Sequence, residues 1–169
     1  MEKVKIYFSK VRPDAVIPSK REEDAGYDLY ACLETDWLEY APHQTQPLPT
    51  GIASAFSDEY YFHIGERGSS GAKSISKRAG VIDSGYRGEW FVMLTNLNDV
   101  PLYFVKPEAE ARLRETLGDA PAILYPTTKA VCQAMLLPVP KTEIEELPLE
   151  QLLEMKSLRG AGKLGSSQK

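Results

Sequence analysis

The chain has 169 residues and a formal net charge of −4, with 43% hydrophobic and 26% charged residues. This composition is ordinary for a globular protein and argues against disorder over the whole length, and about 100–200 residues usually form one domain. The acidic balance disfavours binding to duplex DNA, which requires a basic face. The apolar runs are far shorter than the about 20 residues that a membrane-spanning helix requires. The start of the chain does not resemble a signal peptide.

Cysteine and histidine usage limits the metal and redox chemistry. The two cysteines, Cys32 and Cys132, lie far apart and form no CxxC pair. This pattern indicates free thiols in a reducing compartment, so we expect a cytoplasmic protein without a disulfide framework or zinc site. His43 and His63 are the only histidines, which excludes a histidine-rich metal site.

Short apolar segments recur along the chain between glycines and prolines, of which there are 12 each. Residues 4–8 and 60–64 alternate apolar and polar side chains, which is the period of a strand with one buried face. Residues 90–94 and 131–139 are denser apolar runs, typical of strands buried on both faces. Several short strands separated by turns predict an all-β sandwich or barrel.

Three segments depart from this β pattern. Residues 107–117 (PEAEARLRETL) begin with proline, contain good helix formers and precede Gly118, which predicts a helix. Residues 148–156 predict a second short helix. Residues 157–169 are rich in glycine and serine without apolar periodicity, and we expect a mobile tail there.

Phosphate chemistry is indicated by residues 65–78 (GERGSSGAKSISKR). Serine hydroxyls, an arginine guanidinium and backbone amides freed by glycine are the donors that an oligophosphate requires. A solvated loop has the same composition, so this segment by itself leaves both interpretations open.

Residues 80–90 (GVIDSGYRGEW) place Asp83 directly after two apolar residues. The Ser84-Gly85 turn predicts a β-hairpin. A carboxylate beside the end of an apolar strand can act as a general base, and Tyr86 can stack on a ring. The alternative is that Asp83 only caps the turn.

Two polar side chains interrupt apolar strands. Asp28 lies within residues 24–31 (DAGYDLYA), where a carboxylate requires an arginine or a hydrated cation unless it faces water from an edge strand. Gln133 interrupts residues 130–139 (AVCQAMLLPV). It is either an inward-facing binding group or a core glutamine whose hydrogen bonds are satisfied.

The tail carries the sequence RGAGKLGSS over residues 159–167. It is not a P-loop, because Leu164 follows Lys163 where serine or threonine is required. A flexible arm that becomes ordered over a phosphate fits this composition, and so does a disordered terminus.

In chain order, the five segments resemble the motifs of the homotrimeric dUTPase family, and the match spans nearly the whole chain. DAGYDLYA resembles the first motif, ERGSSGAKS the second, GVIDSGYRGEW the third, KAVCQAMLLPV the fourth and RGAGKLGSS the fifth. The resemblance implies an all-β, jelly-roll-like β-barrel or β-clip with a short helical insertion, assembled as a homotrimer with three shared active sites. It implies one β domain over residues 1–156 with the insertion at about 96–128. Residues 157–169 would form a flexible C-terminal arm that completes the active site.

The resemblance also implies Mg2+-dependent hydrolysis of dUTP to dUMP and pyrophosphate. Asp83 would orient and deprotonate the attacking water, Tyr86 would pack under the deoxyribose, and Asp28 would hold waters of the magnesium shell. The implied nucleotide-binding residues are Arg67, Gly68, Ser69, Ser70, Gly80, Val81, Ile82, Tyr86, Gln133, Arg159, Leu164, Gly165 and Ser166.

Departures from the family pattern leave alternatives open. Leu164 stands where the family usually has a phenylalanine that stacks on uracil, and Lys129 stands where arginine is common. The insertion resembles those of some bacteriophage members and predicts contact with another protein through residues 96–128. The alternative functions are a nucleotide-sensing regulator of the same fold and a dCTP deaminase-like enzyme. No membrane or direct nucleic-acid binding is expected.

Overall fold

The structure is a computed structural model that describes residues 3–158 and 160–161. Contacts divide the chain into two units, Met1–Val139 and Pro140–Lys169, and each is described by itself. Within the described residues, no helix has the length and apolar character needed to cross a membrane.

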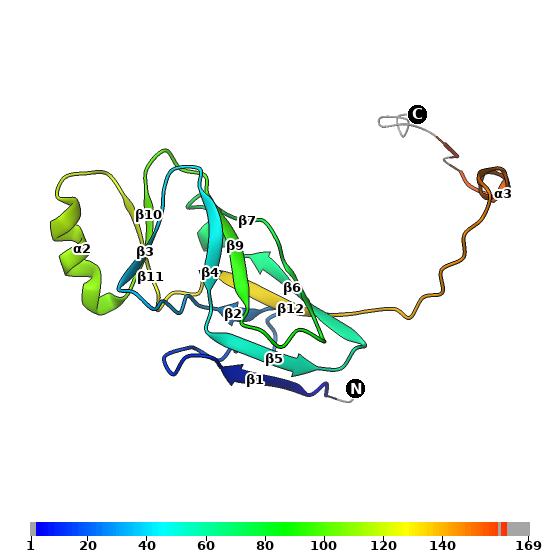
Figure 1. Cartoon of the computed structure of the whole chain (residues 1–169), viewed down its shortest axis with the longest axis horizontal. Helices are drawn as coiled ribbons and strands as arrows, with labels where there is room; N and C mark the ends of the chain where they lie inside the picture. The colour runs from blue at the N-terminus through cyan, green and yellow to red at the C-terminus, as the bar shows by residue number, and fades with distance from the viewer. Residues whose placement is uncertain (1–2, 159, 162–169) are drawn as a thin grey trace. The chain divides into compact units, whose positions relative to one another are not determined.

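Short strands dominate the first unit, and the predicted all-β class is confirmed (Figure 1). The strands are β1 (Ile6–Lys10), β2 (Tyr27–Leu29), β3 (Trp37–Tyr40), β4 (Thr45–Pro49), β5 (Ile52–Phe56), β6 (Tyr60–Glu66), β7 (Ile75–Lys77), β8 (Val81–Asp83), β9 (Phe91–Asn96), β10 (Leu102–Val105), β11 (Ile123–Pro126) and β12 (Cys132–Pro138). The helices are α1 (Gly68–Gly71), the 3-10 helix η1 (Pro107–Ala109), α2 (Glu110–Leu117) and α3 (Leu149–Glu154).

The described strands pair as four sheets around one large core, with a smaller second core beside β10. The strand orders are β1-β5, β11-β10-β3, β4-β9-β7 and β2-β12-β6-β8. The pairings are antiparallel, apart from the parallel pair β10–β11. The pairing does not join the described strands into a single closed ring, so the expected barrel consists here of separate sheets.

Aromatic side chains fill the centre of this core. Phe62 of β6 packs edge-on against Phe56 of β5 and against Trp90, with ring centroids 5.1 Å apart in both pairs. Phe62 and Trp90 are fully buried. Edge-to-face pairs at this separation add about 0.5–1.5 kcal/mol each to the free energy of burial.

The predicted β-hairpin at residues 80–90 is wrong, although its turn is present. The Tyr86 N–H donates to the Asp83 carbonyl at 3.1 Å, which closes the turn after β8. However, β8 pairs with β6, and β9 pairs with β4 and β7 in another sheet. After this turn the chain therefore passes from the sheet that contains β8 to the sheet that contains β9, instead of returning antiparallel to β8.

Burial on both faces, expected of residues 131–139, is only partly found. The strand β12 is buried at Cys132 and Ala134, whereas Leu137 is 36% exposed. Burial alternates over the first four residues of the strand and falls toward its end.

The helix predicted at residues 107–117 is confirmed as η1 followed by α2. Gly118 follows the helix with a φ of 55°, a backbone conformation that favours glycine. Ala109 and Leu113 of this helical segment pack on Tyr103 and Val105 of β10, forming a small second core. The parallel pair β10–β11 flanks this helical segment, and the sequence pattern did not indicate it.

The second unit contains α3, which confirms the short helix predicted at residues 148–156. Its apolar side chains are exposed, including Leu152 at 53% and Leu153 at 60%. The unit begins at Pro140, earlier in the chain than residue 157, where the C-terminal arm is predicted to begin.

Candidate active site

A cavity of about 740 Å³, here called the arginine hollow, opens beside β2 and β12. Asp28 of β2 lies directly opposite Gln133 of β12 in the strand register, which brings these two predicted site residues together. The lining residues are Ser19, Lys20, Arg21, Glu23, Asp24, Ala25, Gly26, Asp28, Arg67 and Gln133.

Arg67 lies at the start of α1, where the chain leaves β6. Its Nε is 3.1 Å from the Asp28 carboxylate, and its Nη1 donates to the Ala130 carbonyl at 3.0 Å. Arginine is therefore the partner that the sequence required for Asp28. Both side chains are about one-third exposed, at 32% for Arg67 and 34% for Asp28, so a ligand in the hollow can reach them.

Gln133 is held at the edge of the same hollow. Its Nε2 donates to the Glu66 carbonyl at 3.0 Å. Gly26 lies against it, since a Cβ at Gly26 would lie 2.8 Å from the Gln133 Cβ and Oε1 atoms. A larger residue at position 26 would displace the glutamine, which explains the glycine in the first motif.

The two serines of the second motif have different environments. Ser69 is exposed, whereas Ser70 is buried and its hydroxyl donates to the Val131 carbonyl at 2.6 Å. Contrary to the prediction for Ser70, this hydroxyl is used inside the fold and does not line the hollow. Ser69 does not line the hollow either, but its exposed hydroxyl makes it the better candidate for a phosphate contact.

A second cavity of about 250 Å³, the tyrosine hollow, lies at β8. Asp83 and Tyr86 are both exposed in it, and the Tyr86 hydroxyl donates to the Glu89 carbonyl at 2.9 Å. The lining residues are Val81, Ile82, Asp83, Tyr86, Glu89 and Phe91.

Gly80 allows β8 to approach β6 closely. The Ile64 N–H donates to the Gly80 carbonyl at 2.7 Å, and a Cβ at Gly80 would lie 2.6 Å from the Ile64 carbonyl oxygen. Because that oxygen belongs to the backbone of β6, it could move aside only if the strand shifted, so a side chain at position 80 would disturb the pairing of β8 with β6. On its other side β8 is the edge of its sheet, so its outward backbone groups remain unused by sheet pairing.

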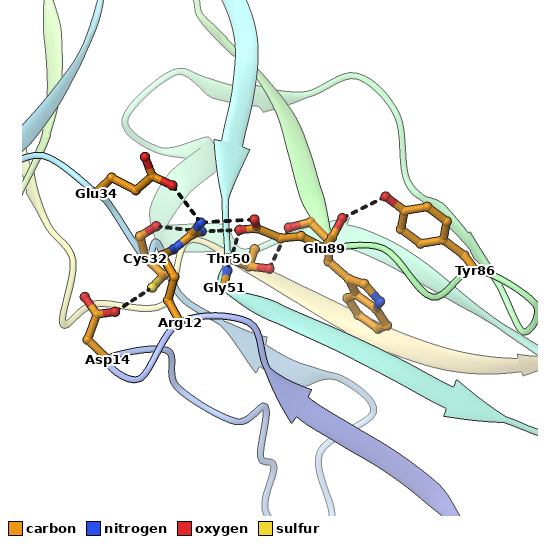
Figure 2. Close-up of polar contacts among 9 residues, drawn as sticks. Arg12, Asp14, Cys32, Glu34, Thr50, Gly51, Tyr86 and Glu89 are labelled. Carbon is orange, nitrogen blue, oxygen red and sulfur yellow. Dashed lines mark hydrogen bonds and ion pairs between the residues drawn. The ribbon is translucent and has the colours of Figure 1, made fainter.

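An ion pair that sequence reasoning missed holds the end of the tyrosine hollow (Figure 2). Arg12 donates through two nitrogens to the Glu89 carboxylate and also to the Cys32 carbonyl at 3.1 Å. The Gly51 N–H donates to Glu89 at 2.8 Å. Burial lowers the pKa of Arg12, but its contacts with Cys32 and Glu89 outweigh burial and raise the pKa overall.

This network reaches Tyr86 through one residue. Glu89 receives the charged contacts on its side chain and the Tyr86 hydroxyl on its carbonyl. The Thr50 hydroxyl donates to the next carbonyl, that of Trp90, at 2.6 Å. The chain between Tyr86 and β9 is thus fixed from both sides, and Tyr86 with it.

Within one chain, the two hollows lie far apart. The strands β2 and β8 are opposite edges of the four-stranded sheet, with β12 and β6 between them. In the strand register, Asp28 is opposite Gln133 of β12, and Gln133 is opposite Gly65 of β6. Asp83 of β8 is opposite Tyr61, four residues before Gly65 on the same strand β6. Three strand spacings and four residue steps place Asp28 and Asp83 roughly 20 Å apart.

Comparisons with known proteins show the family of this chain. The dUTPase family model matches residues 13–113. A deoxyuridine 5'-triphosphate nucleotidohydrolase of Leptospira interrogans is 38% identical over 100 residues, which cover 57% of this chain and 68% of the relative. That of Gloeobacter violaceus is 28% identical over 171 residues, covering 99% of both chains. The chain belongs to the dUTPase family.

Solved structures show the same fold. A mutant dUTPase of Staphylococcus bacteriophage 80alpha with dUpNHpp matches with a TM-score of 0.73 at 16% identity, covering 96% of this chain and 98% of the other. The dUTPase of EIAV matches with a TM-score of 0.61 at 17% identity, covering 86% and 98%.

The predicted arm residues Arg159, Leu164, Gly165 and Ser166 lie outside the described residues. Gly68 is in α1 beside Arg67, and Val81 and Ile82 line the tyrosine hollow. Of the remaining predicted residues, Asp28, Arg67 and Gln133 line the arginine hollow, and Val81, Ile82, Asp83 and Tyr86 line the tyrosine hollow. Gly68, Ser69 and Gly80 are within two residues of this lining in the sequence but line neither hollow, and Ser70 is in the core.

Proposed function

We propose that this chain is a dUTP diphosphatase, which hydrolyses dUTP to dUMP and pyrophosphate. The single observation that carries the proposal is the tyrosine hollow, where an exposed carboxylate and an exposed tyrosine ring lie beside an unpaired strand edge. A base, a surface for a sugar and a row of backbone donors and acceptors suit a pyrimidine nucleotide.

The unpaired edge of β8 supports selection of uracil. Backbone N–H and C=O groups of residues 80–86 can pair with the uracil carbonyls and ring N–H as another strand would. A cytosine amino group would face a donor there and would lose a hydrogen bond on burial, which discriminates strongly. Tyr86 would pack under the deoxyribose and leave no room for a 2′-hydroxyl.

Asp83 would act as the general base. Its carboxylate would accept a proton from the attacking water as the water oxygen bonds to phosphorus. The bond from that phosphorus to the bridging oxygen would then break, and pyrophosphate would leave. Asp83 is exposed at the end of β8, so a water can reach it.

The arginine hollow would bind the phosphates. Arg67 supplies charge-assisted donors and Gln133 supplies an amide. Ser69 lies outside the lining of the hollow, two residues after Arg67, and its exposed hydroxyl would add a donor. Within the described residues no group of three acidic, histidine or cysteine side chains could hold a metal ion by itself. Mg2+ usually binds through one carboxylate, substrate phosphates and water, and Asp28 at this hollow fits that mode. When bound, the ion would neutralise phosphate charge.

We propose further that the active sites form between copies of the chain in a homotrimer. The roughly 20 Å between Asp28 and Asp83 supports this arrangement, because one nucleotide must engage both hollows. Apolar side chains exposed in the tyrosine hollow also favour assembly, namely Val81 at 62% and Phe91 at 45%. The arm over residues 157–169 would close the site.

Product analysis tests the activity. The protein is incubated separately with dUTP, dCTP, dTTP and UTP, with Mg2+ or EDTA, and products are separated by ion exchange. We expect dUMP and pyrophosphate from dUTP alone, dependent on Mg2+. Asp83→Asn removes the base and should lower kcat by about 10²–10⁴-fold. Asp99→Asn changes an aspartate that is 96% exposed on its side chain, outside both hollows, and should match the wild type.

The alternative functions give different results in the same experiment. Release of dUMP or dUTP from dCTP would indicate a deaminase. Binding of dUTP without turnover of any nucleotide would indicate a nucleotide-sensing regulator.

A further inference from the structure

Two buried hydroxyls connect β11 to the start of α1. Tyr125 of β11 is fully buried, and its hydroxyl donates to the Ala130 carbonyl at 2.7 Å. Ser70 donates to the neighbouring Val131 carbonyl at 2.6 Å. The two hydroxyl oxygens are 3.2 Å apart. Since each hydroxyl has one proton, the two short bonds to carbonyls use both protons, and the oxygens lie side by side.

The Ala130 carbonyl connects Tyr125 to Arg67 of the arginine hollow. It accepts one hydrogen bond from Tyr125 and another from Arg67 Nη1 at 3.0 Å. A carbonyl oxygen has two lone pairs, so the two donors occupy the acceptor together. Tyr125 therefore fixes the oxygen against which Arg67 is aligned, while Asp28 fixes the guanidinium at Nε.

The Tyr125 ring is itself immobilised. Phe104 of β10 packs against it with ring centroids 5.3 Å apart, and the Lys129 ammonium lies 5.4 Å from its ring centroid. The register places Tyr125 opposite Phe104 in the parallel pair β10–β11. The position of the hydroxyl thus depends on strands within residues 96–128.

We propose that Tyr125 is a positioning residue for Arg67, so that residues 96–128 help to build the phosphate-binding half of the active site. The proposal rests on the proposed function, because it assigns Arg67 to the phosphates of the substrate. Tyr125 does not line the arginine hollow and acts through the Ala130 carbonyl.

The test is Tyr125→Phe, which keeps the ring and removes only the hydroxyl. A lost neutral hydrogen bond corresponds to about a fivefold change in affinity, so we expect KM for dUTP to rise about fivefold. Because Arg67 would hold the phosphates equally before and during reaction, kcat should stay within about twofold of the wild type. Calorimetric titration with the non-hydrolysable analogue dUpNHpp should show the same fivefold loss, whereas affinity for deoxyuridine should not change.

The matched control is Tyr103→Phe. Tyr103 lies in β10 within the same segment and is also buried, but it packs in the second core with α2 and its hydroxyl contacts Glu39. We expect it to leave KM and both affinities unchanged. Unchanged KM in Tyr125→Phe would overturn the proposal. Equal weakening by Tyr103→Phe, or of deoxyuridine, would overturn it too, because either result indicates a general loosening of the fold.

A second variant covers failure of Tyr125→Phe to fold. Ser70→Ala removes the neighbouring hydroxyl, and since Ser70 is buried, its effect must pass through the fold. It should also weaken dUpNHpp and spare deoxyuridine; no effect would count against the hydroxyl pair. A wild-type chain that binds dUpNHpp but hydrolyses no dUTP would refute the proposed function alone, because the binding measurements need no turnover.

Discussion

The two hollows are supported by opposite kinds of chemistry. The tyrosine hollow depends on a charged pair, Arg12 and Glu89, whose side chains are only 17% and 11% exposed. The arginine hollow depends on a neutral pair of hydroxyls, Tyr125 and Ser70, that donate to two neighbouring carbonyls. Both supports come from segments distant in sequence from the residues they hold.

The difference predicts different kinds of failure. Removing one partner of a largely buried ion pair leaves an uncompensated charge, and such losses cost about 3–5 kcal/mol. Removing a neutral hydroxyl from a site where the acceptor keeps a second donor costs about 1 kcal/mol. The tyrosine hollow should therefore fail through loss of stability, and the arginine hollow through loss of affinity.

The largest effect is expected when two variants, each with a different hollow disabled, are co-expressed. Asp83→Asn and Arg67→Ala each disable one hollow, and each variant alone should lose at least about tenfold in activity. If sites are shared in a trimer, random mixing by co-expression gives about three-quarters mixed trimers, each with one intact site of three. Activity should then recover to about one quarter of the wild type.

The control for this mixture uses the double variant Asp83→Asn/Arg67→Ala co-expressed with the wild type. Shared sites again predict about one quarter of full activity, whereas sites within single chains predict about one half. No recovery in the first mixture, together with one half in the second, would show that each chain completes its own site.

The second effect concerns the charged support. Glu89→Gln should lower the free energy of unfolding by about 3 kcal/mol, because Arg12 then remains largely buried without its countercharge. The measurement is urea denaturation at fixed protein concentration, since the proposed assembly would make stability depend on concentration.

Glu34→Gln is the matched control for the charged support. Glu34 also contacts Arg12, at 3.3 Å, but its side chain is 79% exposed, so its loss should change stability by less than about 1 kcal/mol. Equal effects of Glu34→Gln and Glu89→Gln would contradict the importance assigned to burial.

The smallest effect is expected in the alkylation rates of the two cysteines. Cys32 lies beside the charged support and Cys132 lies beside the arginine hollow. Burial raises the pKa of Cys132 to about 12, and burial together with Asp14 raises the pKa of Cys32. A raised thiol pKa reduces the reactive thiolate, which for Cys132 is on the order of one in ten thousand molecules at pH 8.

We therefore expect slow alkylation of the folded protein by iodoacetamide at pH 8, with Cys32 reacting before Cys132 as the pH rises. Peptide mass spectrometry identifies the modified residue, and the protein unfolded in guanidinium should react quickly at both positions. Faster modification of Cys132 in the folded protein would show that β12 opens more readily than its burial implies.

The fold was predictable where the signal is local. The alternation at residues 60–64 became β6, and the proline and glycine around residues 107–118 bounded a helix. A carboxylate in an apolar strand required a partner, and Asp28 has one in Arg67. The strand and the helix follow from patterns within a few residues, whereas for Asp28 the local pattern indicated that a partner was needed but not which residue it would be.

The supports of the site could not be predicted in this way. Arg12 and Glu89 are 77 residues apart, and neither belongs to a periodic pattern that would indicate its partner. Ser70 lies in a segment whose composition is typical of phosphate binding, but the turn of α1 directs its side chain into the core. The hairpin prediction failed similarly, because a local turn does not determine which strand β8 will pair with.

The parallel pair β10–β11 sets a minimum length on the chain that joins the two strands. Deleting residues 107–118 would leave only Lys106 and residues 119–122 to return from the end of β10 to the start of β11. Parallel neighbours need a connection of about a dozen residues, so β11 would separate from its partner. Tyr125 would then leave the Ala130 carbonyl. The helix is thus the span that keeps Arg67 aligned from a distance, and if Arg67 binds the phosphates as proposed, trimming the helix should weaken substrate binding.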